Sequence, residues 1–159
     1  MRKVRAIAIT ASAVVVSAVI TACGTGVAST PAAPTELEIR NLFPVWNAAL
    51  ATGDPQKVAD LYAPDAVLLP TVSNQVRRTR AEIVDYFTKF LKDKPHGEMR
   101  DQIVDVLDAD TAINAGVYEF TLTKEGKQRQ VKARYTYVYE LRDGKWLIVN
   151  HHSSAMPEG

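Results

Sequence analysis

Two adjacent histidines, His151 and His152, are the residues in this sequence best suited to chemistry. They follow the apolar residues 146–149 near the end of the chain. In a β-strand, successive side chains point to opposite faces, so the two imidazoles cannot converge on one ion. His96 is the only other histidine and Cys23 the only cysteine. We therefore expect no zinc or iron site.

The same alternation divides the nearby aromatic and polar side chains between two faces. Tyr135, Tyr137 and Tyr139 share one face of residues 134–140. In the last strand, strict alternation places Leu147, Val149, His151 and Ser153 on one face, and Trp146, Ile148, Asn150, His152 and Ser154 on the other. Only one face of each strand can line a concavity beneath the helices.

Aromatic rings around one histidine and one or two hydroxyl groups have three interpretations. They suit the binding of an uncharged or weakly polar small molecule. They also suit acid–base catalysis, with His151 near its working pKa and a tyrosine hydroxyl donating to a developing oxyanion. The rings can also fill space in a curved sheet and reach water with their hydroxyls.

Three helices are expected before these strands. A capping box at Thr35 and Glu38 begins an amphipathic helix through Leu50, which Pro44 bends. Asp54 and Pro55 begin a short second helix through Tyr62, which residues 63–65 end. Residues 66–70 form a short strand. A second capping box, at residues 79–82, begins the third helix, which stops by Pro95.

Four long strands follow, at residues 98–107, 111–123, 128–141 and 146–154. The connections between them are short and rich in Asp and Gly, which requires antiparallel neighbours. The sequence therefore predicts an α+β domain, with three N-terminal helices packed on one face of a curved, mainly antiparallel sheet.

The first residues are typical of a secretory signal. Arg2, Lys3 and Arg5 precede the uncharged run 6–20, and the next charge is Glu36. Ile20, Thr21 and Ala22 before Cys23 resemble the lipobox of bacterial lipoproteins. We expect residues 1–22 to be a lipoprotein signal peptide and Cys23 to carry a lipid that holds the secreted protein in the bacterial cell envelope. An ordinary signal peptide with an incidental cysteine is the alternative.

The mature chain gives no electrostatic reason to bind nucleic acid. Cleavage before Cys23 removes three of the 19 basic residues and none of the 18 acidic ones, which leaves a chain near neutrality. Residues 23–34 are small, uncharged and contain proline, as in a flexible tether. The folded domain is therefore expected at residues 35–159.

The order of elements resembles the nuclear transport factor 2-like superfamily, also called SnoaL-like, a cone-shaped α+β fold. The tail from Arg142 to Ser154 is similar to the end of the association (hub) domain of calcium/calmodulin-dependent protein kinase II. A bacterial set of relatives, the SgcJ/EcaC group, is more similar still. Its marks are Trp46-Asn47, Gly53-Asp54, residues 61–66, residues 133–137 and residues 151–157.

This resemblance implies a pocket between sheet and helices, and self-association through the outer face of the sheet. In the kinase hub, arginines of that pocket hold small carboxylates. Their positions fall here on Tyr118, Tyr137 and Ser153. Because none of the three carries positive charge, carboxylate binding is not carried over. The bacterial group is often labelled oxidoreductase, but no dinucleotide or flavin fingerprint is present, so no cofactor is expected.

Three functions remain open from the sequence. The preferred one is a lipid-anchored domain that self-associates and holds a small, largely apolar ligand. The residues expected to line its pocket are Trp46, Tyr62, Tyr118, Tyr137, His151 and Ser153. The second is an isomerase- or cyclase-type enzyme with His151 as base and Tyr137 as donor, by analogy of fold alone. The third is an oligomeric interaction module without a ligand.

Overall fold

The computed structural model describes residues 32–157. The predicted signal peptide, Cys23 and most of the tether lie outside these residues. The helices are α1 (Glu36–Arg40), α2 (Leu42–Ala51), α3 (Pro55–Ala59), α4 (Arg80–Phe90) and the 3₁₀ helix η1 (Leu91–Asp93). The strands are β1 (Tyr62–Leu69), β2 (His96–Val106), β3 (Thr111–Lys124), β4 (Lys127–Arg142) and β5 (Lys145–Ala155).

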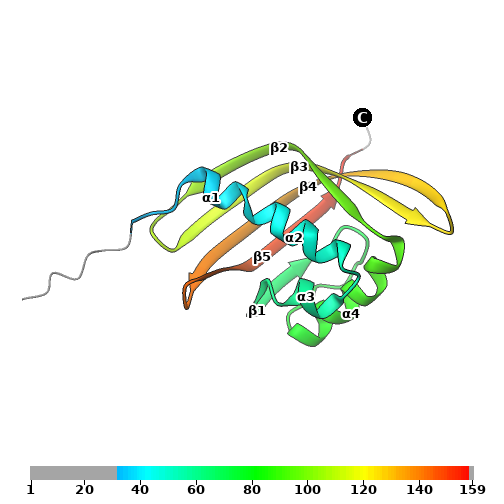
Figure 1. Cartoon of the computed structure of the whole chain (residues 1–159), viewed down its shortest axis with the longest axis horizontal. Helices are drawn as coiled ribbons and strands as arrows, with labels where there is room; N and C mark the ends of the chain where they lie inside the picture. The colour runs from blue at the N-terminus through cyan, green and yellow to red at the C-terminus, as the bar shows by residue number, and fades with distance from the viewer. Residues whose placement is uncertain (1–31, 158–159) are drawn as a thin grey trace, which may run out of the picture. The chain divides into compact units, whose positions relative to one another are not determined.

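The strands form one sheet in the order β1-β5-β4-β3-β2, and α1 and α2 lie across one of its faces (Figure 1). Strands β2 to β5 pair as antiparallel neighbours, as their short connections require. Strand β1 joins the edge parallel to β5. The predicted α+β class and the mainly antiparallel sheet are therefore confirmed.

The first predicted helix is two helices. The capping box of Thr35 and Glu38 begins α1, and a break at Asn41 separates it from α2. Pro44 is the third residue of α2, where a helix has no internal partner for the backbone N–H. The bend therefore comes before Pro44, and the proline costs no helical hydrogen bond.

The second predicted helix is shorter than the sequence indicates. Helix α3 ends at Ala59, and Tyr62 begins β1, where it pairs with Ile148 of β5. Pro64 does not break the strand because β1 is an edge strand whose register shifts between Tyr62 and Val67. Pairing with a strand more than 80 residues away therefore decides the conformation of this segment.

The third predicted helix begins at its capping box, with Thr79 and Glu82 bonded to each other's backbone. It continues as η1 and ends at Lys94, which has a φ of 45°. None of the helices in residues 32–157 is both long enough and apolar enough to cross a membrane.

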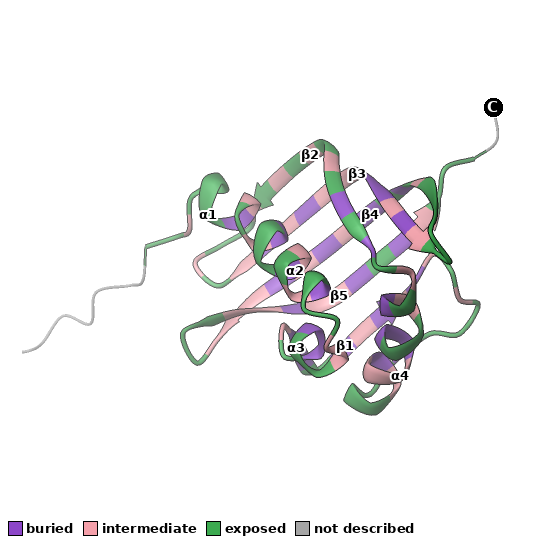
Figure 2. Ribbon diagram, turned by 45° about the vertical axis from the view of Figure 1, so that its right-hand side comes forward, coloured by how far each residue is buried: buried purple, intermediate pink, exposed green. Residues whose placement is uncertain are grey.

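Buried residues alternate with exposed ones along the strands, so the core lies between the sheet and the helices (Figure 2). Tyr135, Tyr137 and Tyr139 share this inner face, as predicted. The alternation predicted for β5 is wrong for the residues before a bulge, Trp146 to Ile148. A bulge pairs Val138 with Asn150 but Tyr139 with Ile148, so Ile148 faces the core together with His151.

Candidate functional site

The structure brings the six predicted pocket residues together around His151. Helix α2 supplies Trp46, and the sheet supplies the other five from four different strands. These five are Tyr62 of β1, Tyr118 of β3, Tyr137 of β4, and His151 and Ser153 of β5. All six side chains are buried. His152 lies on the opposite face and is exposed, so the two histidines do not act as a pair.

One nitrogen of His151 receives a hydrogen bond whose direction is fixed by Trp46. The Trp46 Nε1–H donates to the Tyr62 hydroxyl over 3.1 Å. An indole N–H can only donate, so Tyr62 directs its own proton to His151 Nδ1, 2.9 Å away. The hydrogen bonds therefore assign the proton of the neutral imidazole to Nε2.

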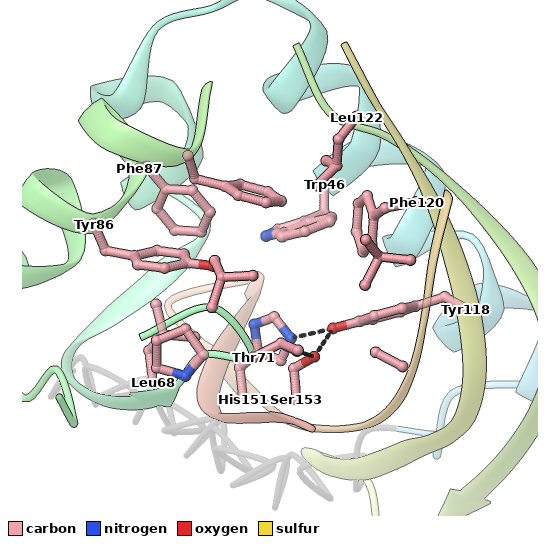
Figure 3. Close-up of a pocket in the computed structure, with 15 residues that line it drawn as sticks. Trp46, Leu68, Thr71, Tyr86, Phe87, Tyr118, Phe120, Leu122, His151 and Ser153 are labelled. Atoms are coloured by element: carbon pink, nitrogen blue, oxygen red, sulfur yellow. Dashed lines mark hydrogen bonds between the residues drawn. The ribbon is translucent and has the colours of Figure 1, made fainter. Parts of the chain in front are cut away.

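The second nitrogen of His151, Nε2, connects to further hydrogen bonds that lead toward the surface. His151 Nε2 lies 3.5 Å from the Tyr118 hydroxyl, and Tyr118 donates to Ser153 Oγ (Figure 3). Ser153 in turn bonds Thr71, in the segment after β1. The Ser153 hydroxyl can donate a hydrogen bond to Thr71, and the Thr71 hydroxyl can then donate to an acceptor in the cavity.

Burial keeps every group in this hydrogen-bonded network uncharged at neutral pH. Loss of hydration, with a smaller effect of His152, lowers the pKa of His151 to about 3. Burial also raises the pKa of Tyr62 and of Tyr118 far above neutrality. The expectation that His151 has a pKa near the working pH of a general base is therefore wrong, because the ring lies wholly inside the core.

Tyr137 does not form an acid–base pair with His151. Its ring stacks on the imidazole, with centroids 4.1 Å apart and planes at 29°. The Tyr137 hydroxyl is buried and has no hydrogen-bond partner among residues 32–157. Both nitrogens of His151 face other tyrosines. The geometry therefore does not support the predicted catalytic pair.

Four of the six residues line a narrow cavity, named here the inner pocket. These are Trp46, Tyr118, His151 and Ser153, whereas Tyr62 and Tyr137 support His151 from behind. The volume of this cavity is about 30 Å³. Because a cavity needs roughly 10–15 Å³ to accommodate one water molecule, the pocket has room for only one or two.

Sequence reasoning missed most of the outer wall of the inner pocket. Among the fifteen lining residues are Leu68, Pro70, Thr71, Val72, Tyr86, Phe87, Phe90, Phe120 and Leu122. Tyr86, Phe87 and Phe90 recur at helical spacing, but that spacing does not indicate which cavity the helix would cover. Thr71 lies in a polar segment that carries no periodic signal.

Tyr62→Phe is expected to destabilise the domain. It removes the hydroxyl that bridges Trp46 and His151, and leaves a buried donor and a buried acceptor unpaired. The expected loss is about 2 kcal/mol in the free energy of unfolding, measured by urea denaturation. Tyr139→Phe is the control, because its buried hydroxyl has no partner among the described residues. Equal losses in the two variants would contradict the assigned network.

Because His151 is buried in its neutral form, we expect the free energy of unfolding to decrease as the pH is lowered. The unfolded chain takes up a proton near the ordinary pKa of 6.5, but folded His151 does so only near pH 3. Protonation therefore favours unfolding, and stability is lost as the pH falls from 6.5 toward 3. The expected loss between pH 6.5 and 5 is about 2 kcal/mol, at roughly 1.4 kcal/mol per pH unit. The measurement is urea denaturation at several pH values, in which His151→Gln should lack this dependence of stability on pH. The same dependence in the wild type and in the variant would refute its assignment to His151.

Comparison with known proteins identifies the family that has this architecture. The sequence model of the calcium/calmodulin-dependent protein kinase II association domain matches residues 35–157. The chain belongs to this association-domain family. A crystal structure from Xanthomonas campestris, described as a candidate association domain of this kind, is 60% identical to the chain. It aligns with a TM-score of 0.76 over 82% of this chain and 97% of its own.

More distant structures agree in fold. The association domain of the C. elegans kinase aligns with a TM-score of 0.62 at 15% identity, over 75% of this chain and 94% of its own. A nuclear transport factor 2-like protein from Novosphingobium aromaticivorans, with a cystatin-like fold, aligns with a TM-score of 0.64 at 16% identity, over 77% and 82%. No curated protein sequence gives a match. The predicted nuclear transport factor 2-like fold is therefore confirmed.

Within the association-domain family, this chain has an inner pocket without formal charge. The three positions matched to hub arginines, Tyr118, Tyr137 and Ser153, lie together around His151. None of the fifteen residues that line the pocket is Lys, Arg, Asp or Glu. Residues 32–157 also contain no group of three side chains placed to hold a metal ion.

Proposed function

We propose that this protein is a self-associating domain, held in the bacterial cell envelope by a lipid on Cys23, whose inner pocket takes a small and largely apolar group. Membership of the association-domain family supports self-association. The observation that carries this proposal is the character of the outer face of the sheet, the face turned away from α1 and α2.

One part of that outer face, over β2, β3 and β4, is apolar or β-branched, and polar or charged side chains border it. The side chains of this apolar patch come from three adjacent strands: Ile103 of the edge strand β2, Ile113, Ala115 and Val117 of β3, and Thr136 and Val138 of β4. On the other side of β4, strand β5 adds the polar residues Asn150, His152 and Ser154 to the same face. Ile103 is 63% exposed. The rim includes Asp105, Lys132 and Arg134. An apolar centre with a polar rim is the composition of protein–protein interfaces.

The inner pocket supports a ligand that is uncharged where it meets His151. The aromatic walls favour an apolar group, and the hydrogen-bond chain that ends at Thr71 can present one donor to it. A ligand larger than about two water molecules requires residues 70–73 to move outward. Val72 in that segment is 50% exposed, so displacing it disturbs little of the core.

The lipid anchor is tested by the intact mass of the protein extracted from its native membranes. We expect a chain that begins at an acylated Cys23, and a Cys23→Ala variant that is recovered with the soluble fraction. An unmodified chain that begins at another residue would exclude the anchor and leave an ordinary secreted protein. Self-association is tested separately, by the mass of the assembly in solution.

A further inference from the structure

A second and larger cavity lies beside the inner pocket and is named here the outer cavity. Its volume is about 380 Å³, within the range of small-molecule sites. The two cavities share the apolar residues Val72, Tyr86, Phe90 and Leu122 as walls. The remaining wall of the outer cavity is polar and consists of Ser73, Arg77, Lys89, Asp93 and Arg129.

Arg77 is the buried cation of this cavity. Its backbone forms two hydrogen bonds of 2.9 Å with Leu68 of β1, which fix its position. The side chain is 7% exposed. A guanidinium group held there rigidly is suited to planar oxyanions, which it can bind with two parallel hydrogen bonds.

The hydrogen-bond donors of Arg77 are only partly used. Nη1 donates to Asp85 over 2.9 Å, and Nη2 reaches Ser73 Oγ at 3.5 Å. Nε is buried and has no acceptor among residues 32–157. Asp85 is itself 46% exposed and is shared with Lys89. A buried guanidinium therefore lacks full compensation for its lost hydration, which a bound anion would supply.

The charged residues that line the outer cavity, counted together with Asp85, which pairs with two of them from outside the lining, leave an excess of one positive charge. Arg77, Lys89 and Arg129 are the cations, and Asp85 and Asp93 are their carboxylate partners. The Arg129–Asp93 pair is loose, at 3.7 Å. This balance favours a ligand with a single negative charge.

We propose that the outer cavity binds an organic monoanion, whose oxyanion pairs with Arg77 and whose apolar part packs on Tyr86, Phe90 and Leu122. The inference deepens the ligand-binding part of the proposed function by assigning the ligand a charge and a second subsite. Arg77 does not stand at any of the three hub-arginine positions, so the site is independent of that resemblance.

The test uses benzoate as probe and benzamide as its uncharged counterpart, with the full-length chain in mild detergent and titration calorimetry. We expect benzoate to bind with a millimolar or lower Kd and benzamide at least about 10-fold more weakly, as loss of a charge-assisted hydrogen bond predicts. Equal binding of the two probes, or no binding of benzoate at millimolar concentration, would overturn the site.

Three variants locate the site. Arg77→Gln should weaken benzoate about 10-fold or more. Lys89→Gln should weaken it a few-fold, and because Lys89 is 67% exposed, this variant keeps the fold even if Arg77→Gln does not. Arg80→Gln is the matched control. Arg80 lies on α4, as Lys89 does, but it does not line the outer cavity. Unchanged binding in Lys89→Gln, or equal weakening in Arg80→Gln, would place the anion elsewhere. Light scattering on the same samples reports self-association independently.

Discussion

Gly116→Ala is expected to lose about 3 kcal/mol or more of the free energy of unfolding, because a methyl group at this position meets backbone atoms. An added Cβ would lie 2.1 Å from the carbonyl oxygen of Asp101 and 2.7 Å from its carbonyl carbon. The register of β2 shifts between Met99 and Asp101, just before Gln102, which pairs with Gly116. Neither backbone atom can rotate away, so β3 and the edge strand β2 must separate at this point.

Urea denaturation followed by circular dichroism measures this loss. Gly126→Ala is the control, since Gly126 also has a positive φ, of 76°, but has no atom within 4 Å of an added Cβ. It should lose only the cost of a left-handed alanine, about 1 kcal/mol. Similar losses in both variants would show that the strands do not approach as closely at Gly116 as the fold requires.

Val138→Glu is expected to break the assembly while leaving the subunit folded. Val138 lies at the centre of the outer face, opposite Ile113 of β3 and Asn150 of β5. In the monomer its replacement meets water, whereas in the proposed interface a carboxylate would be buried without a partner. We expect the Kd of self-association to rise about 100-fold or more, from roughly 3 kcal/mol of uncompensated charge.

Sedimentation velocity over a range of concentrations measures that change. Gln130→Glu is the matched control, because it adds the same charge to the same face of β4 near the hairpin, away from the apolar centre. It should leave the subunit number unchanged. A Val138→Glu protein that sediments as the wild type does would move the interface to another surface.

The sequence predicted the parts of the fold that depend on local patterns. Alternation placed Tyr135, Tyr137 and Tyr139 on one face, and the capping boxes at Thr35 and Thr79 located two helix starts. Local patterns failed where distant pairing decides the outcome. The bulge near Val149 turned Ile148 inward, and pairing with β5 made Tyr62 the first residue of a strand.

The candidate site was predictable in its members but not in its chemistry. The sequence identified the aromatic residues and His151 because their side chains share a face. It did not reveal that His151 would be buried deeply enough to stay neutral, nor that Tyr137 would stack on it. Arg77 carried no signal at all, because an arginine in a polar segment is usually exposed and only the fold buries it.

The most direct test of the central claim is the subunit number of a protein that spans residues 23–159, in native mass spectrometry after gentle purification. Self-association through the outer face of the sheet predicts a defined oligomer whose mass is a whole multiple of the subunit. It also predicts that Val138→Glu reduces the mass toward that of one chain. A wild-type protein that remains monomeric at micromolar concentrations would contradict the proposal that this domain works by assembling with itself.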